Sequence, residues 1–456
     1  MALAAGHAGL FAGCEGASQD RPNVVLITID TIRADHLGCY GYGRARTPNI
    51  DAFAAAAVLF DQASPTINTT LASHASLLTG FYPQTLALPR NSFPLEAEFE
   101  TLAGILSGRG YETAAFVSAS ALHSRMGLAR GFHLYEETFE IQGLDQDQRR
   151  AQETTRAVME WLGARHRNPF FLWVHYFDPH YPYDPPAPYD TLYGSGYEGP
   201  ADGSMEYLSG IWERSARKIE PEQEDLQRVV DLYDGEIAYL DFWLGPLLER
   251  LGRPEHLERT LVAIAGDHGE SLTEHDYLFN HGLKLYEPTL RVPLILRLPG
   301  TMGAEARTVP AQVQVHDLFP TILAASGAPV PPRVEAVDLT PLALGRTDSA
   351  RPFVYAEASR PWQVERTHPG SYQNLHKAAA VQSYPWKLIV TPFENRTELY
   401  DLERDPGELV DLSLQDPARV AELKRVLDAW RRGAVRVAGR PDPENLERLR
   451  SLGYTR

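Results

Sequence analysis

The chain has 456 residues, of which 43% are hydrophobic, and its 60 acidic and 43 basic side chains give a formal charge of −17. This hydrophobic content can build a sizeable buried core, which excludes a disordered tail, and the acidic balance argues against nucleic acid as the main partner. Two cysteines exclude a disulfide framework and a cysteine-based zinc site. No apolar run reaches the ~20 residues that a membrane-spanning helix needs.

The first 20 residues differ from the rest of the chain. An Ala/Gly/Leu-rich stretch ends in small residues before Cys14, and a polar segment follows. This pattern resembles the end of a bacterial lipoprotein signal, although it has no Lys or Arg at its start and His7 interrupts it. We expect residues 1–20 to be a leader. As a signal it would direct the protein to the periplasm or anchor it to the outer membrane, and otherwise the protein would be cytoplasmic.

Three continuous apolar runs predict strands that are buried on both faces. They lie at 23–29, 170–175 and 260–265, and runs without polar alternation are typical of parallel sheets covered by helices. Residues 222–251 have apolar side chains at three- and four-residue spacing, which predicts one long amphipathic helix. We therefore expect an α/β domain over residues 21–345, with a doubly wound, mostly parallel sheet.

The pattern changes after a proline-rich stretch at 310–341. Short apolar runs at 353–356, 378–381 and 386–390 predict strands, and 418–432 has the periodicity of an amphipathic helix. We interpret residues 346–456 as a smaller C-terminal α+β subdomain with a small antiparallel sheet and a helix.

Acidic and histidine side chains follow all three predicted buried strands. Asp30 follows the first, and Asp267 and His268 follow the third; Asp178 and His180 come shortly after the second. In doubly wound sheets function gathers at these strand ends, and a buried carboxylate is stable only when paired or metal-bound. A single Asp after a strand is more often a helix N-cap, but together with a hydroxyl-rich turn these residues predict a cation site. Carboxylates with an imidazole suit Zn²⁺ or Mn²⁺ better than Ca²⁺.

Several segments resemble the sulfatase branch of the alkaline phosphatase superfamily. They occur in the expected order between about residues 22 and 432, at 30–41 (DTIRADHLGCYG), 46–51 (RTPNID), 73–80 (SHASLLTG), 266–270 (GDHGE), 286–295 (YEPTLRVPLI) and 399–408 (LYDLERDPGE). The resemblance implies an alkaline-phosphatase-like fold and metal-dependent hydrolysis of sulfate or phosphate esters.

The resemblance also implies a nucleophile about 40 residues after Asp30, at Thr70. True sulfatases carry a cysteine or serine there that is oxidised to formylglycine, with a proline two residues on and an arginine four residues on. This chain has Thr70, Ala72 and His74 instead. A threonine cannot become the aldehyde, but its hydroxyl can attack as an alkoxide if a metal lowers its pKa. Thr69 is the competing choice, although alignment of residues 75–80 favours Thr70.

Sulfatases usually carry a second aspartate after the first metal ligand, where this chain has Thr31. The spacing Asp-x-x-x-His of two-metal relatives does not occur within 175–184. We therefore expect one divalent ion, Zn or Mn rather than Ca or Mg, and its expected ligands are Asp30, Thr70, Asp267 and His268.

The resemblance also implies that five further side chains handle the substrate. His180 and His281 are expected to transfer the proton to the leaving oxygen, because the pKa of histidine lies near neutrality. His74, Asn91 and Lys284 are expected to contact the substrate, and Lys284 is an alternative to His281 for proton transfer. The chain has 15 histidines, and any one of them is more often a surface or capping residue.

The expected substrate is a small anionic ester or a sulfated or phosphorylated glycan. Phosphate and phosphonate esters fit as well as sulfates, because a phosphothreonine can be cleaved by a second in-line attack when a metal assists. Two alternatives stay open. One is a transferase of phospho-alcohol groups in the cell envelope, whose relatives usually carry N-terminal membrane helices; the other is a non-catalytic protein that binds anionic glycans. The sequence does not indicate an oligomeric state.

Overall fold

A computed structural model describes residues 21–138, 148–164, 166, 169–194, 196–300, 306–359, 377–433 and 442–443. Cys14 and the predicted leader lie outside these residues, so the localisation stays a prediction. Within the described ranges, no helix is both long and apolar enough to cross a membrane.

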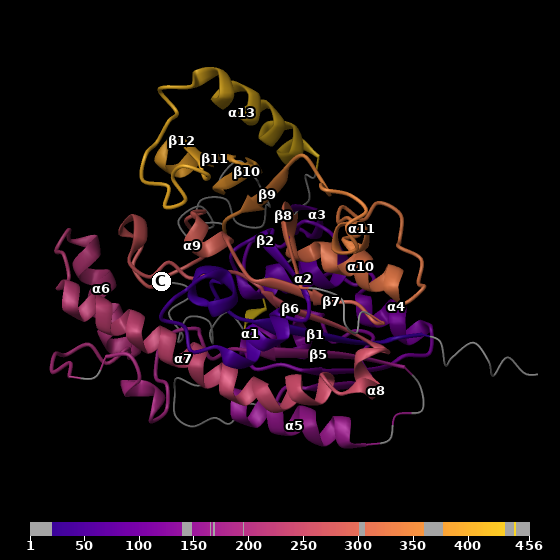
Figure 1. Cartoon of the computed structure of the whole chain (residues 1–456). Coiled ribbons are helices and arrows are strands. Elements are labelled where there is room, and N and C mark those ends of the chain that lie inside the picture. The colour runs from indigo at the N-terminus through magenta and orange to yellow at the C-terminus, as the bar shows by residue number, and fades with distance from the viewer. Residues whose placement is uncertain are drawn as a thin grey trace, which may run out of the picture.

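A sheet of eight described strands forms the centre of the protein (Figure 1). Its order is β4-β3-β5-β1-β6-β7-β2-β8, and only β7 runs against its neighbours. The predicted mostly parallel sheet is confirmed, and the three strands predicted from apolar runs are its adjacent members β5, β1 and β6. The strands are β1 Asn23–Ile29, β2 Val58–Ser64, β3 Glu112–Phe116, β4 Leu134–Glu136, β5 Phe170–Tyr176, β6 Thr260–Gly266, β7 Leu294–Arg297 and β8 Arg307–Gln314.

Helices cover both faces of this sheet, as the apolar runs predict. Alternate residues of one strand face opposite layers: Val24 and Leu26 pack with α2, α4 and α10, whereas Val25 and Ile27 pack with α1, α5 and α7. The predicted helix at 222–251 is α7. The helices are α1 Pro48–Ala54, α2 Thr70–Thr79, α3 Pro83–Leu86, α4 Leu102–Gly108, α5 Ala151–Gly163, α6 Met205–Ala216, α7 Gln223–Leu251, α8 Pro254–Leu257, α9 Glu287–Leu290, α10 Leu318–Ala325, α11 Thr340–Ala343 and α13 Pro417–Arg432.

The C-terminal part forms a separate antiparallel sheet, drawn in orange and yellow at the top of Figure 1. Its order is β12-β11-β10-β9, and α13 packs Leu423 and Leu427 against it. This sheet meets the main domain at Ile67, which forms a β-bridge with Glu357. There the Glu357 N–H donates to the Thr66 carbonyl at 3.0 Å. The strands are β9 Val354–Glu357, β10 Ala379–Ser383, β11 Trp386–Thr391 and β12 Arg396–Asp401.

Candidate functional site

The carboxyl ends of β5, β1 and β6 lie at one level in the main sheet. Ile29 of β1 is aligned with Tyr176 of β5 and with Gly266 of β6. The segments that follow these strands therefore leave the sheet beside one another. This register brings Asp30 beside Asp267 and His268, and the start of α2 adds Thr70, the fourth residue predicted to share a cation.

These four side chains are fully buried and cluster around Nε2 of His268. This nitrogen lies 3.4 Å from Oγ1 of Thr70 and 3.5 Å from Oδ1 of Asp30. It lies 3.6 Å from Oδ2 of Asp267. Ligand atoms of Asp30, Asp267 and His268 all lie within 4.8 Å of one another, which is the spacing of groups that share one cation.

Thr70 is the first residue of α2, where the backbone N–H groups of a helix attract anions. The preceding residue, Thr69, has an extended backbone and ends the incoming loop. Ser73, one turn into α2, donates its hydroxyl to the Asp267 carbonyl at 2.6 Å. The sequence thus places a hydroxyl at a positively polarised helix end and ties that helix to the segment after β6.

Two backbone N–H groups hold the Asp267 carboxylate in place. His268 N donates to Oδ1 of Asp267 at 2.7 Å, and Thr31 N donates to the same oxygen at 3.3 Å. Thr31 reaches it with a φ of 50°, a strained value for a β-branched residue, and Tyr233 donates its hydroxyl to the Thr31 carbonyl at 2.9 Å. Oδ1 is therefore satisfied by the protein, and Oδ2 is left for the cluster.

Gly269, the second glycine of the segment 266–270, is required by a close backbone approach. A Cβ on Gly269 would lie 2.1 Å from the carbonyl oxygen of Pro288 in α9. The Gly269 N–H donates to the Thr289 carbonyl at 3.0 Å. This contact fixes the turn that carries Asp267 and His268, and it explains why no larger residue fits after them.

The hydrogen bonds of His268 determine which of its nitrogens carries the proton. Nδ1 lies 3.0 Å from the Gly269 carbonyl, which can only accept, so Nδ1 is protonated and the lone pair of Nε2 faces the carboxylates. Burial lowers the pKa of His268 to about 3, which keeps the ring neutral. Burial raises the pKa of Asp30 and Asp267, and the charge of Asp30 raises that of Asp267 further.

The cluster fits a divalent cation. Both carboxylate oxygens of Asp30 and Oδ2 of Asp267 are buried and have no hydrogen-bond partner among the described residues. Buried carboxylate oxygens normally have partners. Two such carboxylates beside an imidazole lone pair and a hydroxyl are the nitrogen and oxygen donor set of Zn²⁺ or Mn²⁺.

His180 and His281 lie in a row of histidines that ends at His268. The ring of His281 lies 4.5 Å from that of His268 and 5.2 Å from that of His180, centroid to centroid. Nδ1 of His281 donates to Oε1 of Glu270 at 3.1 Å, and Nδ1 of His180 donates to the Tyr181 carbonyl at 2.5 Å. In both neutral rings Nε2 is then the nitrogen that can accept a proton.

The three predicted substrate contacts have different positions. Asn91 accepts the Leu71 N–H at 2.9 Å, and its Nδ2 is buried without a partner among the described residues, which leaves a donor near the start of α2. His74 is fully buried, and both of its nitrogens already lie near protein oxygens. Lys284 pairs with Glu394 at 2.6 Å, so its ammonium is directed at the C-terminal part.

Two residues in or beside the cluster received no role from the sequence. His175 lies at 0% exposure in β5, and its Nε2 is 3.5 Å from Oδ2 of Asp30. The sequence feature that could have indicated it is an imidazole near the end of an otherwise apolar and aromatic strand. Glu270, which holds His281, stands within the segment 266–270, but nothing in the spacing indicated its partner.

The family models and the known proteins that this chain resembles all point to sulfatases. Residues 22–328 match the family model described as Sulfatase, and residues 274–431 match that of the N-sulphoglucosamine sulphohydrolase C-terminal region. An arylsulfatase of Clostridium perfringens is 25% identical over 478 aligned residues, which cover 89% of this chain and 94% of the relative. A Delta 4,5-hexuronate-2-O-sulfatase of Bacteroides thetaiotaomicron is 24% identical over 453 residues, covering 92% and 90%.

Solved structures show the same fold. The phosphonate monoester hydrolase of Agrobacterium radiobacter superposes with a TM-score of 0.74 at 24% identity, covering 91% of this chain and 96% of that one. The Sulfatase match spans more than half of the chain and includes every residue of the cluster. The chain therefore belongs to the sulfatase family, as an ester hydrolase of that family.

Proposed function

We propose that this protein hydrolyses sulfate, phosphate or phosphonate esters with Thr70 as the nucleophile and with one divalent cation in its site. The observation that carries the proposal is the convergence of the Thr70 hydroxyl, two carboxylates and the His268 lone pair within 3.4–3.6 Å. Each of these groups is buried, and three carboxylate oxygens have no hydrogen-bond partner among the described residues.

Asp30, Asp267 and His268 would hold the cation, with Thr70 beside them. When bound, such a cation neutralises charge on a non-bridging ester oxygen and lowers the pKa of a nearby hydroxyl. Zn or Mn is favoured because an imidazole nitrogen stands among the ligands. Sulfatase-family enzymes are metal-dependent, which supports the same assignment.

In the first step the Thr70 oxygen forms a bond to sulfur or phosphorus, and the bond from that atom to the leaving alcohol oxygen breaks. The proton lost by the Thr70 hydroxyl passes to Nε2 of His281 or His180 and from there to the leaving oxygen. Glu270 favours His281 for this task, because its carboxylate stabilises the imidazolium that forms. Nδ2 of Asn91, beside the start of α2, would bind the anion.

In the second step water attacks the sulfur or phosphorus atom, and the bond to the Thr70 oxygen breaks. The proton that the attacking water gives up passes to the Thr70 oxygen, and the free anion leaves. A threonine ester cannot be released by elimination, as the hydrate of an aldehyde can, so release needs this second in-line displacement. We therefore include phosphate and phosphonate esters beside sulfates.

The substrate class proposed here is a sulfated or phosphorylated glycan or a smaller anionic ester. The Bacteroides thetaiotaomicron relative is named a hexuronate 2-O-sulfatase, and the Agrobacterium radiobacter structure is that of a phosphonate monoester hydrolase. One relative is named for a sulfate ester and the other for a phosphonate ester. Both kinds of ester therefore belong in the set of substrates to be assayed.

The test is a panel of aryl sulfate, phosphate mono- and diester, phosphonate monoester and sulfated sugar, assayed with the protein loaded with Mn²⁺ or Zn²⁺. We expect Thr70→Ala to abolish turnover while cation binding largely survives, and Thr70→Ser to retain part of it because the hydroxyl remains. Acid quenching should trap a sulfuryl or phosphoryl group on the peptide that contains residue 70. Full turnover by Thr70→Ala would refute the nucleophile, and a loaded wild type inactive on every ester would favour a non-catalytic protein.

A further inference from the structure

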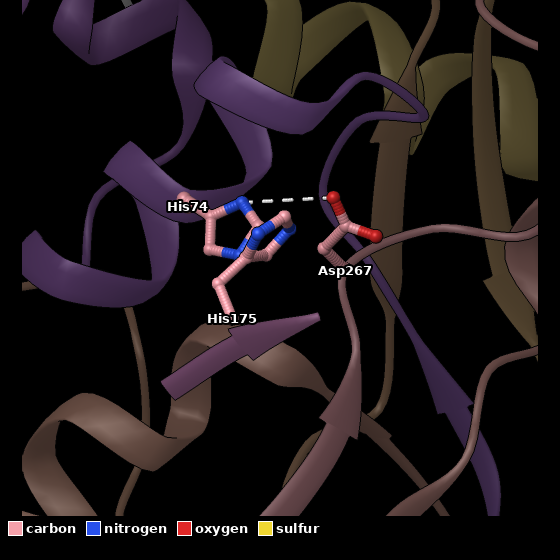
Figure 2. A group of neighbouring side chains, drawn as sticks. All are labelled: His74, His175 and Asp267. Atoms are coloured by element: carbon pink, nitrogen blue, oxygen red, sulfur yellow. Dashed lines mark ion pairs between the residues drawn. The ribbon is translucent and has the colours of Figure 1, made fainter. Parts of the chain in front are cut away.

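Each carboxylate of the proposed cation site has a second, fully buried histidine beside it. His175 lies against Asp30, and His74 lies against Asp267. Figure 2 shows His74 on its helix with a ring nitrogen directed at the Asp267 carboxylate, and His175 beside it at the end of β5. Neither histidine has a part in the chemical steps described above.

The hydrogen bonds of His74 identify its protonated nitrogen. Nδ1 lies 2.7 Å from the Thr70 carbonyl, which can only accept, so Nδ1 carries the proton. Nε2 lies 3.0 Å from Oγ1 of Thr28, and that oxygen accepts the Trp173 Nε1–H at 3.0 Å and so has its own proton to donate to Nε2. The Nδ1–H of His74 also lies 3.5 Å from Oδ2 of Asp267.

His175 has the opposite tautomer. Its Nδ1 accepts the Ser118 N–H at 3.4 Å, so the proton of the neutral ring is on Nε2. Nε2 lies 3.5 Å from Oδ2 of Asp30 and has no hydrogen-bond partner among the described residues.

The same atoms have the spacing of a second cation site. Ligand atoms of His74, His175 and Asp267 lie within 4.8 Å of one another. The hydrogen positions argue against that use, because a protonated nitrogen has no lone pair for a cation. His74 directs its proton at the Thr70 carbonyl, and its other nitrogen is already satisfied by Thr28.

We propose that His74 and His175 are positioning residues: each directs one N–H, from 3.5 Å, at the carboxylate of Asp267 or Asp30 and so orients both carboxylates toward a single shared cation. The two carboxylates repel each other in a dry site, so neutral donors that hold them together favour the cation-binding arrangement. Since the His74 N–H also contacts the Thr70 carbonyl, it aligns the start of α2 with Asp267. This inference rests on the cation site of the proposed function.

The first experiment measures cation affinity instead of activity. His74→Leu and His175→Leu remove the N–H at similar volume, and their affinity for Mn²⁺ and Zn²⁺ is measured by chelator competition, with stoichiometry from elemental analysis. We expect about 10–100-fold weaker binding of one equivalent. His316→Leu is the control, because His316 is equally buried but packs on Tyr82, and its variant should bind as the wild type does.

Conservative variants test the tautomers and do not depend on how the leucine variants fold. The amide nitrogen of Asn overlies Nδ1 of histidine, and that of Gln overlies Nε2. His74→Asn should therefore restore most of the affinity and His74→Gln should not, whereas His175→Gln should restore it and His175→Asn should not. A merely structural role would not produce this crossed pattern.

Two results would overturn the positioning role. One is unchanged affinity in folded His74→Leu and His175→Leu proteins. The other is a wild type that binds two equivalents and loses one in either leucine variant, which would make these histidines direct ligands of a second cation. A wild type that binds no divalent cation would instead refute the proposed function itself, so the two failures are distinguishable.

Discussion

Glu270 accepts a hydrogen bond from His281, with Oε1 of the glutamate 3.1 Å from Nδ1 of the histidine. Both side chains are buried, and the ring of His281 in turn lies 4.5 Å from that of His268. With Glu270 ionised, the contact keeps the proton of the neutral His281 ring on Nδ1, and Nε2 then carries the lone pair. A carboxylate in this position also stabilises the imidazolium that forms when Nε2 accepts a proton.

Glu270→Gln should lower kcat by about 10–100-fold and leave cation affinity unchanged. The glutamine oxygen can still accept the Nδ1–H, so the ring keeps its orientation and loses only the facing charge. Steady-state kinetics and chelator competition on the same preparations separate the two effects. If kcat were unchanged, the proton would pass through His180 alone.

Asp267→Asn should reduce cation occupancy before anything else. Its oxygen can still accept the two backbone N–H groups at Oδ1, so its amide N–H₂ would replace Oδ2 and repel the cation. We expect elemental analysis of the purified variant to show a large loss of bound metal, whereas Thr70→Ala retains most of it. Full occupancy in Asp267→Asn would remove Asp267 from the ligand set.

Most of the fold and the centre of the site could be predicted because both depend on local signals. Apolar runs without polar alternation gave β1, β5 and β6, and the residues that follow them gave Asp30, Asp267 and His268. β12 could not be predicted in this way, because Glu398 stands at a buried position of the strand. Its carboxylate accepts the hydroxyls of Tyr286 and Tyr400, and these contacts are visible only after folding.

The remaining site residues depend on partners far apart in the sequence. His175 faces Asp30 because β5 pairs with β1 in parallel, and Glu270 faces His281 across a turn. Neither contact can be predicted from the spacing of these residues along the chain. His74 is close to Thr70 in sequence, but its buried hydrogen bond to Thr28 of β1 exists only because α2 packs on the sheet.

Lys284→Gln should separate Lys284 from His281 as the proton donor. Lys284 pairs at 2.6 Å with Glu394, and its side chain is 24% exposed. A pair of this exposure contributes about 0–1 kcal/mol, so we expect little change in the melting temperature and none in kcat. His281→Gln should lower kcat strongly in the same assay. A large kcat loss in Lys284→Gln would assign the proton transfer to the lysine.

The pH dependence of stability should include a contribution from Asp178. Its Oδ1 accepts the Ala151 N–H at 2.9 Å, whereas Oδ2 is buried without a partner among the described residues. Burial raises the pKa of Asp178 from 3.8 to about 6. The folded state therefore keeps this proton over a pH range in which the unfolded chain has lost it. The stabilisation is complete below pH 3.8 and is lost as the pH rises through about 6.

Asp178→Asn has no carboxyl to titrate, and its amide oxygen can still accept the Ala151 N–H. The free energy of unfolding of this variant should therefore rise relative to wild type between about pH 4 and 7, by at most ~3 kcal/mol, and then stay level. Urea unfolding at several pH values measures the difference. A difference from wild type that does not change with pH would mean that Oδ2 is ionised and solvated throughout this range.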